Sequence, residues 1–162
     1  MIDVLSNLLK KNKNIVLIYW GKGELKQEIV EKAKEKKVYS NIRFIDPKFG
    51  RVKNKIHNLA DVFVHPSLDE GFALAPLEAM ACSKPVIMNN SHSAKEAISD
   101  GKNGYLCELN NIKDWTDKIT RLKKDSNLLT SMSKGAFKKS QKEFNWDLSV
   151  KKHIEVINRL AQ

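Results

Sequence analysis

Two glutamates, Glu70 and Glu78, stand around the point where a loop leads into a helix. The apolar run Val62–His65 is typical of a strand, a polar loop follows it, and a helical pattern starts near Leu74. The first turn of a helix leaves backbone N–H groups without partners and carries a partial positive charge, so it favours a phosphate group. Gly71 lies in the loop, where the lack of a Cβ lets the backbone approach a ligand closely.

The positions of the two carboxylates indicate what else could bind there. Glu70 precedes the helix and Glu78 lies about one turn inside it, so we expect both to face one ligand. Carboxylates accept hydrogen bonds from neighbouring hydroxyls, such as those of a ribose or a hexose. Phosphate on the helix amides and hydroxyls on the carboxylates together favour a nucleotide sugar.

Each of these residues also has a structural interpretation. A glutamate near a helix start is stabilised by ~0.3–1 kcal/mol through the helix dipole without any ligand, which would explain Glu78. Glu70 could be a solvated loop residue, and Phe72 and Leu74 could belong to the core. Single residues therefore do not decide between the two interpretations.

The elements around this segment alternate between strands and helices. Apolar runs predict strands over residues 15–20, 42–45, 62–65, 85–88 and 105–107, the first of them as a buried parallel strand. Helical spacing is present over residues 24–36, 51–60 and 75–82, and three further helices are predicted over residues 111–124, 127–144 and 146–160. Such alternation predicts a single α/β domain, residues 1–162, with a Rossmann-like parallel sheet, helices on both faces and a helical C-terminal segment. Ligands of such sheets bind at the carboxyl ends of the strands.

A longer pattern surrounds the two glutamates. The chain has Glu70-Gly71-Phe72-Ala73-Leu74, then Glu78-Ala79-Met80-Ala81, then Pro85-Val86-Ile87. This run resembles the signature of the family-four retaining glycosyltransferases of the GT-B fold, in their C-terminal, donor-binding domain. The resemblance extends to Ile15–Gly23 with its Gly-x-Gly turn, to Asp100-Gly101-Lys102-Asn103-Gly104 and to Phe144 with Trp146.

The resemblance implies roles for individual residues. Glu78 would bind the ribose hydroxyls, and Glu70 would contact the donor hexose as the catalytic carboxylate. The loop backbone, at Gly71, Phe72, Ala73 and Leu74, would lie beside the sugar and the diphosphate, and Gly21 would belong to the donor-binding Gly-x-Gly turn. The substrate would be a nucleoside-diphosphate sugar, with no cofactor and no metal, and the hexose would pass to a glycan or lipid-linked acceptor.

The chain departs from the family pattern at several positions. Ala73 and Ser83 replace glycines, and His92 and Ser93 replace a Gly-Gly pair. The family's Arg and Lys that neutralise the diphosphate lie on a first strand and turn ahead of Ile2, so the resemblance implies that this strand and the N-terminal acceptor-binding domain are absent from the chain. We therefore expect a truncated chain, a split subunit or a gene fragment, inactive by itself.

Composition limits the other classes. The net charge is +10, yet residues 61–110 carry 3 basic and 7 acidic side chains, so the positive charge lies toward the two ends. Aromatic residues do not interleave with the lysines, which argues against nucleic acid as a partner. Two alternatives stay open: a non-catalytic donor-binding subunit that needs a separate acceptor-binding partner, and a basic α/β nucleic-acid-binding protein. Without a signal peptide or a membrane-spanning run, we expect a cytoplasmic protein, with peripheral contact at the inner membrane surface as an option.

Overall fold

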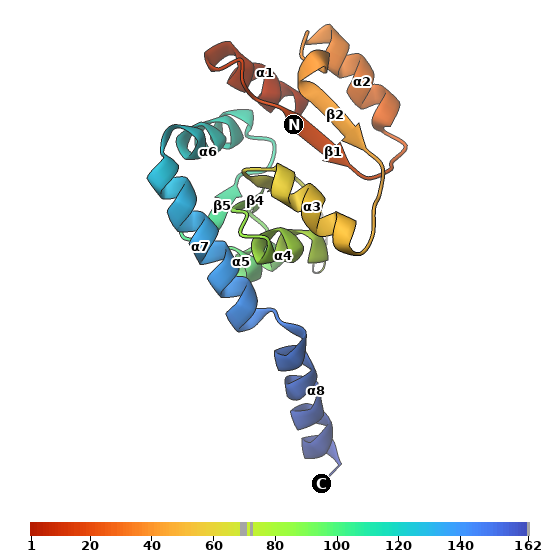
Figure 1. Ribbon diagram of the computed structural model, residues 1–162, viewed down its shortest axis with the longest axis vertical. Helices are drawn as coiled ribbons and strands as arrows, with labels where there is room; N and C mark the ends of the chain where they lie inside the picture. Colours follow the sequence, from red (N-terminus) through yellow and green to blue (C-terminus); the bar gives the residue numbers. More distant parts are fainter. Residues whose placement is uncertain (69–70, 72, 162) are drawn as a thin grey trace.

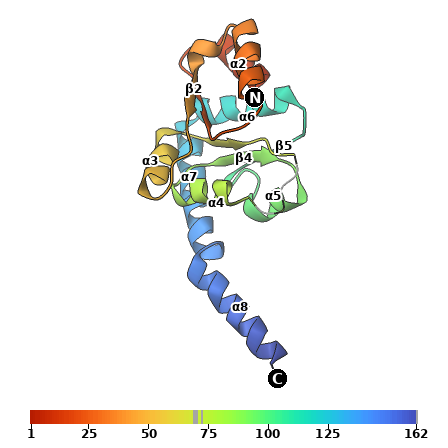
Figure 2. The same cartoon turned by 90° about the vertical axis from the view of Figure 1, so that its right-hand side faces the viewer.

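The strands form two parallel sheets, and helices pack on both faces of the larger one (Figures 1 and 2). The computed structural model describes residues 1–68, 71 and 73–161. One sheet pairs β1 (Leu17–Trp20) with β2 (Ile42–Ile45), and Leu17 lies opposite Ile42. The other sheet has the order β3-β4-β5, with bounds Phe63–His65, Val86–Asn89 and Gly104–Cys107. The helices are α1 (Ile2–Lys11), α2 (Lys26–Glu35), the short 3₁₀ helix η1 (Tyr39–Asn41), α3 (Arg51–Leu59), α4 (Leu74–Ala81), α5 (His92–Ala97), α6 (Ile112–Lys124), α7 (Ser126–Glu143) and α8 (Trp146–Leu160).

The strand β4 is the centre of the core. It pairs with β3 on one edge and β5 on the other, and all four of its residues are buried. Val86 and Met88 pack with residues of α4, α5 and α7, whereas Ile87 packs with residues of α1, α6 and α7. This alternation is expected for a strand with helices on both faces, because successive side chains point to opposite sides.

The turn before β5 is fixed by buried hydrogen bonds. The Asn103 side chain is 2% exposed; it donates to the Ala97 carbonyl at 3.0 Å and accepts from the Ser99 N–H at 2.7 Å. A Cβ on Gly104 would overlap the carbonyl oxygen of Val86, so this position requires glycine. The resemblance had drawn attention to this turn, and its role here is to attach β5 to β4.

At two positions the chain has another residue in place of the family's glycine, and the backbone conformations of these two positions differ. Ser83, after α4, has φ 60°, a left-handed conformation that favours glycine. Ala73 has φ −79°, which any residue adopts easily. The substitution at residue 83 therefore introduces backbone strain, and the one at residue 73 does not.

The predicted α/β fold with parallel strands is confirmed, with differences in detail. The sheet is in two parts, because in the described part of the chain no β-bridge joins β1 with β3. Residues 15 and 16 precede β1, and its four residues are half-buried, so the prediction of a buried strand over 15–20 was wrong in both respects. The helices α1 and α5 were not predicted. The C-terminal helices were, within one residue at each end.

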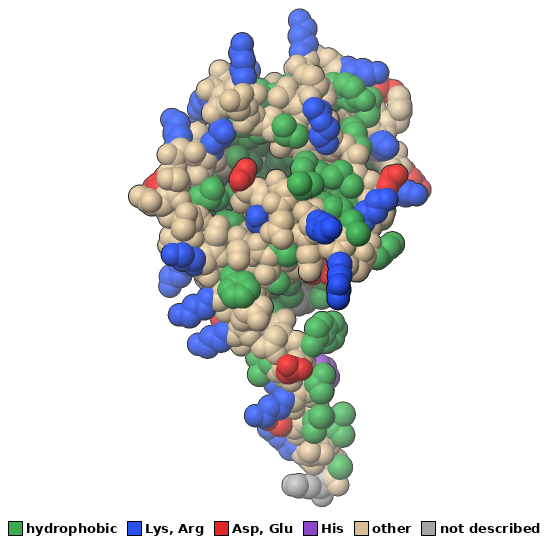
Figure 3. Space-filling model, viewed as in Figure 1, with side chains coloured by type: hydrophobic (Ala, Val, Ile, Leu, Met, Phe, Trp, Pro, Cys, Tyr) green, Lys and Arg blue, Asp and Glu red, His purple; other side chains and the backbone are tan. Residues whose placement is uncertain are grey.

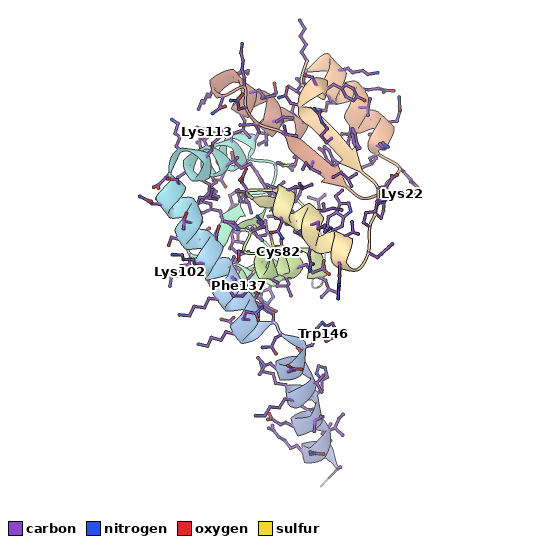
Figure 4. All side chains as sticks on the ribbon, in the orientation of Figure 1. Lys22, Cys82, Lys102, Lys113, Phe137 and Trp146 are labelled. Atoms are coloured by element: carbon purple, nitrogen blue, oxygen red, sulfur yellow. The ribbon has the colours of Figure 1, made fainter. Side chains whose placement is uncertain are left out.

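The last helix, α8, extends away from the rest of the molecule (Figures 1 and 2). None of its residues is buried. Hydrophobic side chains run along one side of it (Figure 3), and they include Trp146 at 78% and Ile157 at 63% exposure. Trp146 lies at the junction with α7 and stands clear of the body (Figure 4).

Candidate functional site

The loop after β3 and the start of α4 have the arrangement that the sequence predicts. The helix begins at Leu74, and Ala73 is its N-cap with extended backbone. No side chain among the described residues caps this helix end, so none of them supplies a side-chain acceptor for its first amides. Leu74 is exposed, and no atom of the described residues lies within 4 Å of a Cβ built on Gly71. The helix start is thus an open backbone surface suited to an anion.

Glu78 lies on α4 one turn inside this helix start and faces α3. Its Oε1 accepts a hydrogen bond from the Lys53 Nζ at 2.5 Å, and the pair is part-buried. Its Oε2 lies 3.9 Å from the Nε2 of His57. The side chain is 35% exposed and is not in the first turn of the helix, so the helix-dipole explanation does not account for it. The carboxylate is therefore held at the surface between α3 and α4.

His57 is the buried partner of this carboxylate. It packs edge-on against Trp20 at the end of β1, with ring centroids 5.1 Å apart, and contacts Phe63 of β3 at 5.6 Å. Burial lowers the pKa of His57, and the nearby Glu78 opposes this effect. Its Nε2 and the Glu78 Oε2 are buried atoms without a hydrogen-bond partner in the described part of the protein. The imidazole thus packs between the end of β1, β3 and Glu78.

Asn89, the last residue of β4, anchors the loop at the same edge of the sheet. Its side chain is 6% exposed and donates to the Ser67 carbonyl at 2.5 Å. A cavity of about 20 Å³ lies beside it, lined by residues that include His65, Ala73 and Met88. That volume is close to the space that one water molecule needs. Asn89 therefore fixes the start of the loop that carries Gly71 and Ala73.

The described residues of the predicted site come from two segments of the chain. Gly71, Ala73, Leu74 and Glu78 lie together along the segment from β3 to α4. Gly21 follows β1 in the other sheet; it has φ 140° and donates to the Ile45 carbonyl at 3.0 Å. Glu70 and Phe72 lie outside the described residues.

Lys53, His57 and Asn89 were missed as site residues. Lys53 and His57 are four positions apart on α3, which places them on one helix face. That spacing was visible in the sequence, but their approach to Glu78 depends on how α3 packs on α4. His92, which the sequence left open as a contact, is exposed at the first position of α5.

The described residues contain neither a metal-binding cluster nor a membrane-spanning helix. No cluster of three or more His, Cys, Asp or Glu side chains in residues 1–68, 71 and 73–161 is arranged to hold a metal ion. In the same ranges, every helix is too short or too polar to cross a bilayer.

Comparison with known sequences places the chain in a family. Residues 1–139 match the family described as glycosyl transferases group 1. An uncharacterized glycosyltransferase of Methanocaldococcus jannaschii is 34% identical over 151 residues, which cover 92% of this chain and 42% of that protein. The D-inositol 3-phosphate glycosyltransferase of Salinispora arenicola is 30% identical over 128 residues, which cover 79% of this chain and 28% of that protein. The chain thus spans less than half the length of these two relatives.

Solved structures agree with this assignment. TarM of S. aureus, in complex with fondaparinux, alpha-GlcNAc-glycerol and UDP, superposes with a TM-score of 0.88 at 25% identity over 97% of this chain and 32% of that one. The C-terminal domain of a group 1 glycosyl transferase from Francisella tularensis gives 0.76 at 27% identity over 90% of this chain and 77% of that domain. Anabaena HepE with UDP and glucose gives 0.86 at 18% identity, covering 96% of this chain and 44% of HepE, which supports the fold. The chain therefore belongs to the group 1 glycosyltransferases and has the fold of their C-terminal GT-B domain.

Proposed function

We propose that this domain binds a nucleoside-diphosphate sugar and forms the donor half of a retaining hexosyltransferase. The observation that carries the proposal is the position of the Glu78 carboxylate, half-exposed and one turn inside the uncapped start of α4. A diphosphate on the first amides of α4 would leave the ribose within reach of this carboxylate. UDP bound to TarM and HepE supports a nucleotide as the ligand of this fold.

The surroundings of Glu78 suit a hydroxyl-binding carboxylate. Lys53 fixes one oxygen, because its ammonium group donates a charge-assisted hydrogen bond to Oε1. A carboxylate oxygen has more than one acceptor position, so ribose hydroxyls can bind while Lys53 stays in place. His57 limits the movement of the second oxygen from the buried side.

The remaining roles complete the proposed mechanism. The backbone at Gly71, Ala73 and Leu74 would orient the sugar, and the amides of α4 would stabilise charge on the leaving diphosphate. Donors that are already in position where charge develops commonly supply a large part of catalysis. Glu70 would contact the hexose as the catalytic carboxylate, a role proposed from the sequence pattern.

Transfer also needs a part that binds the acceptor, a glycan or a lipid-linked saccharide. We place that part in another domain or a partner subunit, because the two curated relatives extend well beyond the region that this chain matches. The exposed apolar side of α8 supports contact with such a part. We expect residues 1–162 alone to bind donor without measurable turnover, in the cytoplasm or at the inner membrane surface.

The experiment is a calorimetric titration of the purified chain with UDP, GDP and ADP, followed by the 2′-deoxy form of whichever binds. Glu78→Gln should weaken nucleotide binding by about tenfold to a hundredfold, since a hydrogen bond to a charged group contributes about 1.5–3 kcal/mol. For the 2′-deoxy nucleotide the loss caused by Glu78→Gln should be smaller, because one of the two ribose hydroxyls that the carboxylate would bind is already absent.

A matched control separates this contact from a general loss of charge. Glu155→Gln changes an exposed glutamate of α8 and should leave every affinity unchanged. If Glu78→Gln binds as tightly as the unmodified chain, the ribose role is wrong. If none of the three nucleotides binds, donor binding by this domain is wrong as well.

A further inference from the structure

The outer side of α7 carries a row of lysines. They stand four residues apart, a spacing that places them along one side of the helix, and a further lysine joins them from the turn before β5. This turn packs so closely on α7 that a Cβ on Gly135 would overlap its backbone. Figure 3 shows blue side chains gathered along α7, and Figure 4 places Lys102 beside this helix. With one aromatic residue these exposed side chains form a surface that we call the α7 face: Lys102, Lys134, Phe137, Lys138 and Lys142.

The lysines of the α7 face differ from other lysines of the molecule in their surroundings. Lys118 of α6, for example, lies 2.8 Å from Asp114 one turn away. In the part of the chain that the structure describes, no ion pair or side-chain hydrogen bond includes a lysine of the α7 face, and Glu143 pairs with Lys139 at 3.9 Å instead. Like charges four residues apart repel each other, so the row lowers the stability of α7. An acidic partner from outside the chain would offset this repulsion.

An aromatic side chain stands among these charges. Phe137 is 46% exposed, whereas Met132 and Ala136 of the same helix are buried in the core. The surface therefore combines unpaired positive charge with a partly exposed ring. This combination suits the surface of a membrane, where lysines meet lipid phosphates and an aromatic ring enters the headgroup layer.

The shape of the α7 face favours a bilayer over nucleic acid. The row from Lys134 to Lys142 spans about 12 Å along a helix on the outside of the molecule (Figure 1). Lipid headgroups in a flat layer can move beneath each lysine of such a row. Single-stranded nucleic acid instead binds along grooves that present several aromatic rings, and the α7 face presents one ring on a convex surface.

We propose that the α7 face binds the surface of an anionic lipid bilayer, with its lysines on the lipid phosphates and Phe137 in the headgroup layer. The proposal rests on the proposed function only in the choice of a membrane, since a lipid-linked acceptor would be held there. It assigns the contact to a surface of this domain that includes no residue of the donor site. The apolar side of α8 remains available to the part that binds the acceptor.

The test is sedimentation of residues 1–162 with vesicles of phosphatidylcholine, alone or with about 30% phosphatidylglycerol. The chain should bind the anionic vesicles and not the neutral ones, and binding should weaken as the salt concentration rises. The triple substitution Lys134→Gln, Lys138→Gln and Lys142→Gln should lower the partition coefficient by more than about tenfold, since each lysine near an anionic surface contributes about fivefold. No nucleotide is present, so the outcome does not depend on donor binding.

Two further variants separate the α7 face from net charge and the ring from the lysines. Lys34→Gln, Lys37→Gln and Lys55→Gln together remove the same charge from exposed positions on α2, the turn after it and α3, and should lower the partition coefficient by less than about threefold. Phe137→Ser keeps every lysine and should lower it by about threefold or more. Urea denaturation of each variant shows that the fold is retained.

Three outcomes overturn the proposal. One is that the unmodified chain fails to bind the anionic vesicles, or binds the neutral vesicles equally well. Another is an equal loss from the two triple substitutions, which assigns the binding to net charge. The third is a short single-stranded oligonucleotide that binds more tightly than the anionic vesicles and is lost in the α7 variant, because the face would then bind nucleic acid. Donor binding, measured separately with UDP, is unaffected by any of these results.

Discussion

The strands β4 and β1 have similar apolar sequences and very different surroundings. All four residues of β4 are buried, whereas all four of β1 are half-buried. β4 has a strand on both edges, and β1 has one on a single edge. For these two strands, the one with both edges occupied is the buried one, while the edge strand β5 is buried at three of its four positions by the helices that cover it. The three-stranded half of the molecule has a completed core, and the two-stranded half adjoins a groove.

The largest expected loss of stability is in the three-stranded sheet, whose core is complete. Ile87→Ala removes a fully buried side chain from β4 and leaves a cavity, because the surrounding helices are fixed by their other contacts. The free energy of unfolding should fall by about 2–5 kcal/mol, measured by urea denaturation. A loss below about 1 kcal/mol would mean that β4 is not packed as a core strand, and the comparison would fail.

The matched substitution in the two-stranded sheet is Ile18→Ala in β1. Ile18 is half-buried and lines a groove of about 570 Å³ between the two sheets, so its truncation enlarges an existing opening and adds little cavity cost. The same urea measurement should give a loss of about 1 kcal/mol, less than half of that for Ile87. Equal losses for Ile18 and Ile87 in residues 1–162 would remove the distinction between the two halves.

The smallest expected effect is a pH dependence of stability caused by His57. This residue lies where the two sheets meet. Burial holds the pKa of this imidazole below its ordinary value, so the unfolded chain binds a proton that the folded chain does not. Stability should therefore be present above about pH 6.5 and be lost as the pH falls below it, since 6.5 is the ordinary histidine value. His57→Phe keeps an aromatic ring against Trp20 and Phe63 and should flatten this dependence.

A control for the pH measurement is His153→Gln on α8, which changes an exposed histidine. Urea midpoints from pH 5 to pH 7.5 should have the same slope in this variant as in the unmodified chain. A slope that persists in His57→Phe would assign the pH dependence to another group.

Local sequence patterns predicted most of the helices and strands. They missed the features that depend on contacts between residues far apart in the sequence. The apolar runs and helical spacings identified all five strands, but the six-residue α5 is too short to show a period. The sequence predicted a single sheet, because neither the β1 segment nor the β3 segment shows by itself whether the two strands pair. The same holds for the site. The segment from Gly71 to Glu78 was found from its residues, whereas Lys53 and His57 come to Glu78 through the packing of α3.

The two cysteines give this protein a built-in attachment point for a spectroscopic probe. Cys107 is buried at the end of β5, and burial raises its pKa to about 12, so it stays a protonated, unreactive thiol at neutral pH. Cys82 is partly exposed at the end of α4 (Figure 4), and mild burial raises its pKa without enclosing the sulfur. A maleimide dye should therefore attach at Cys82 first, on the helix that carries Glu78, and its emission would report nucleotide binding without an engineered thiol.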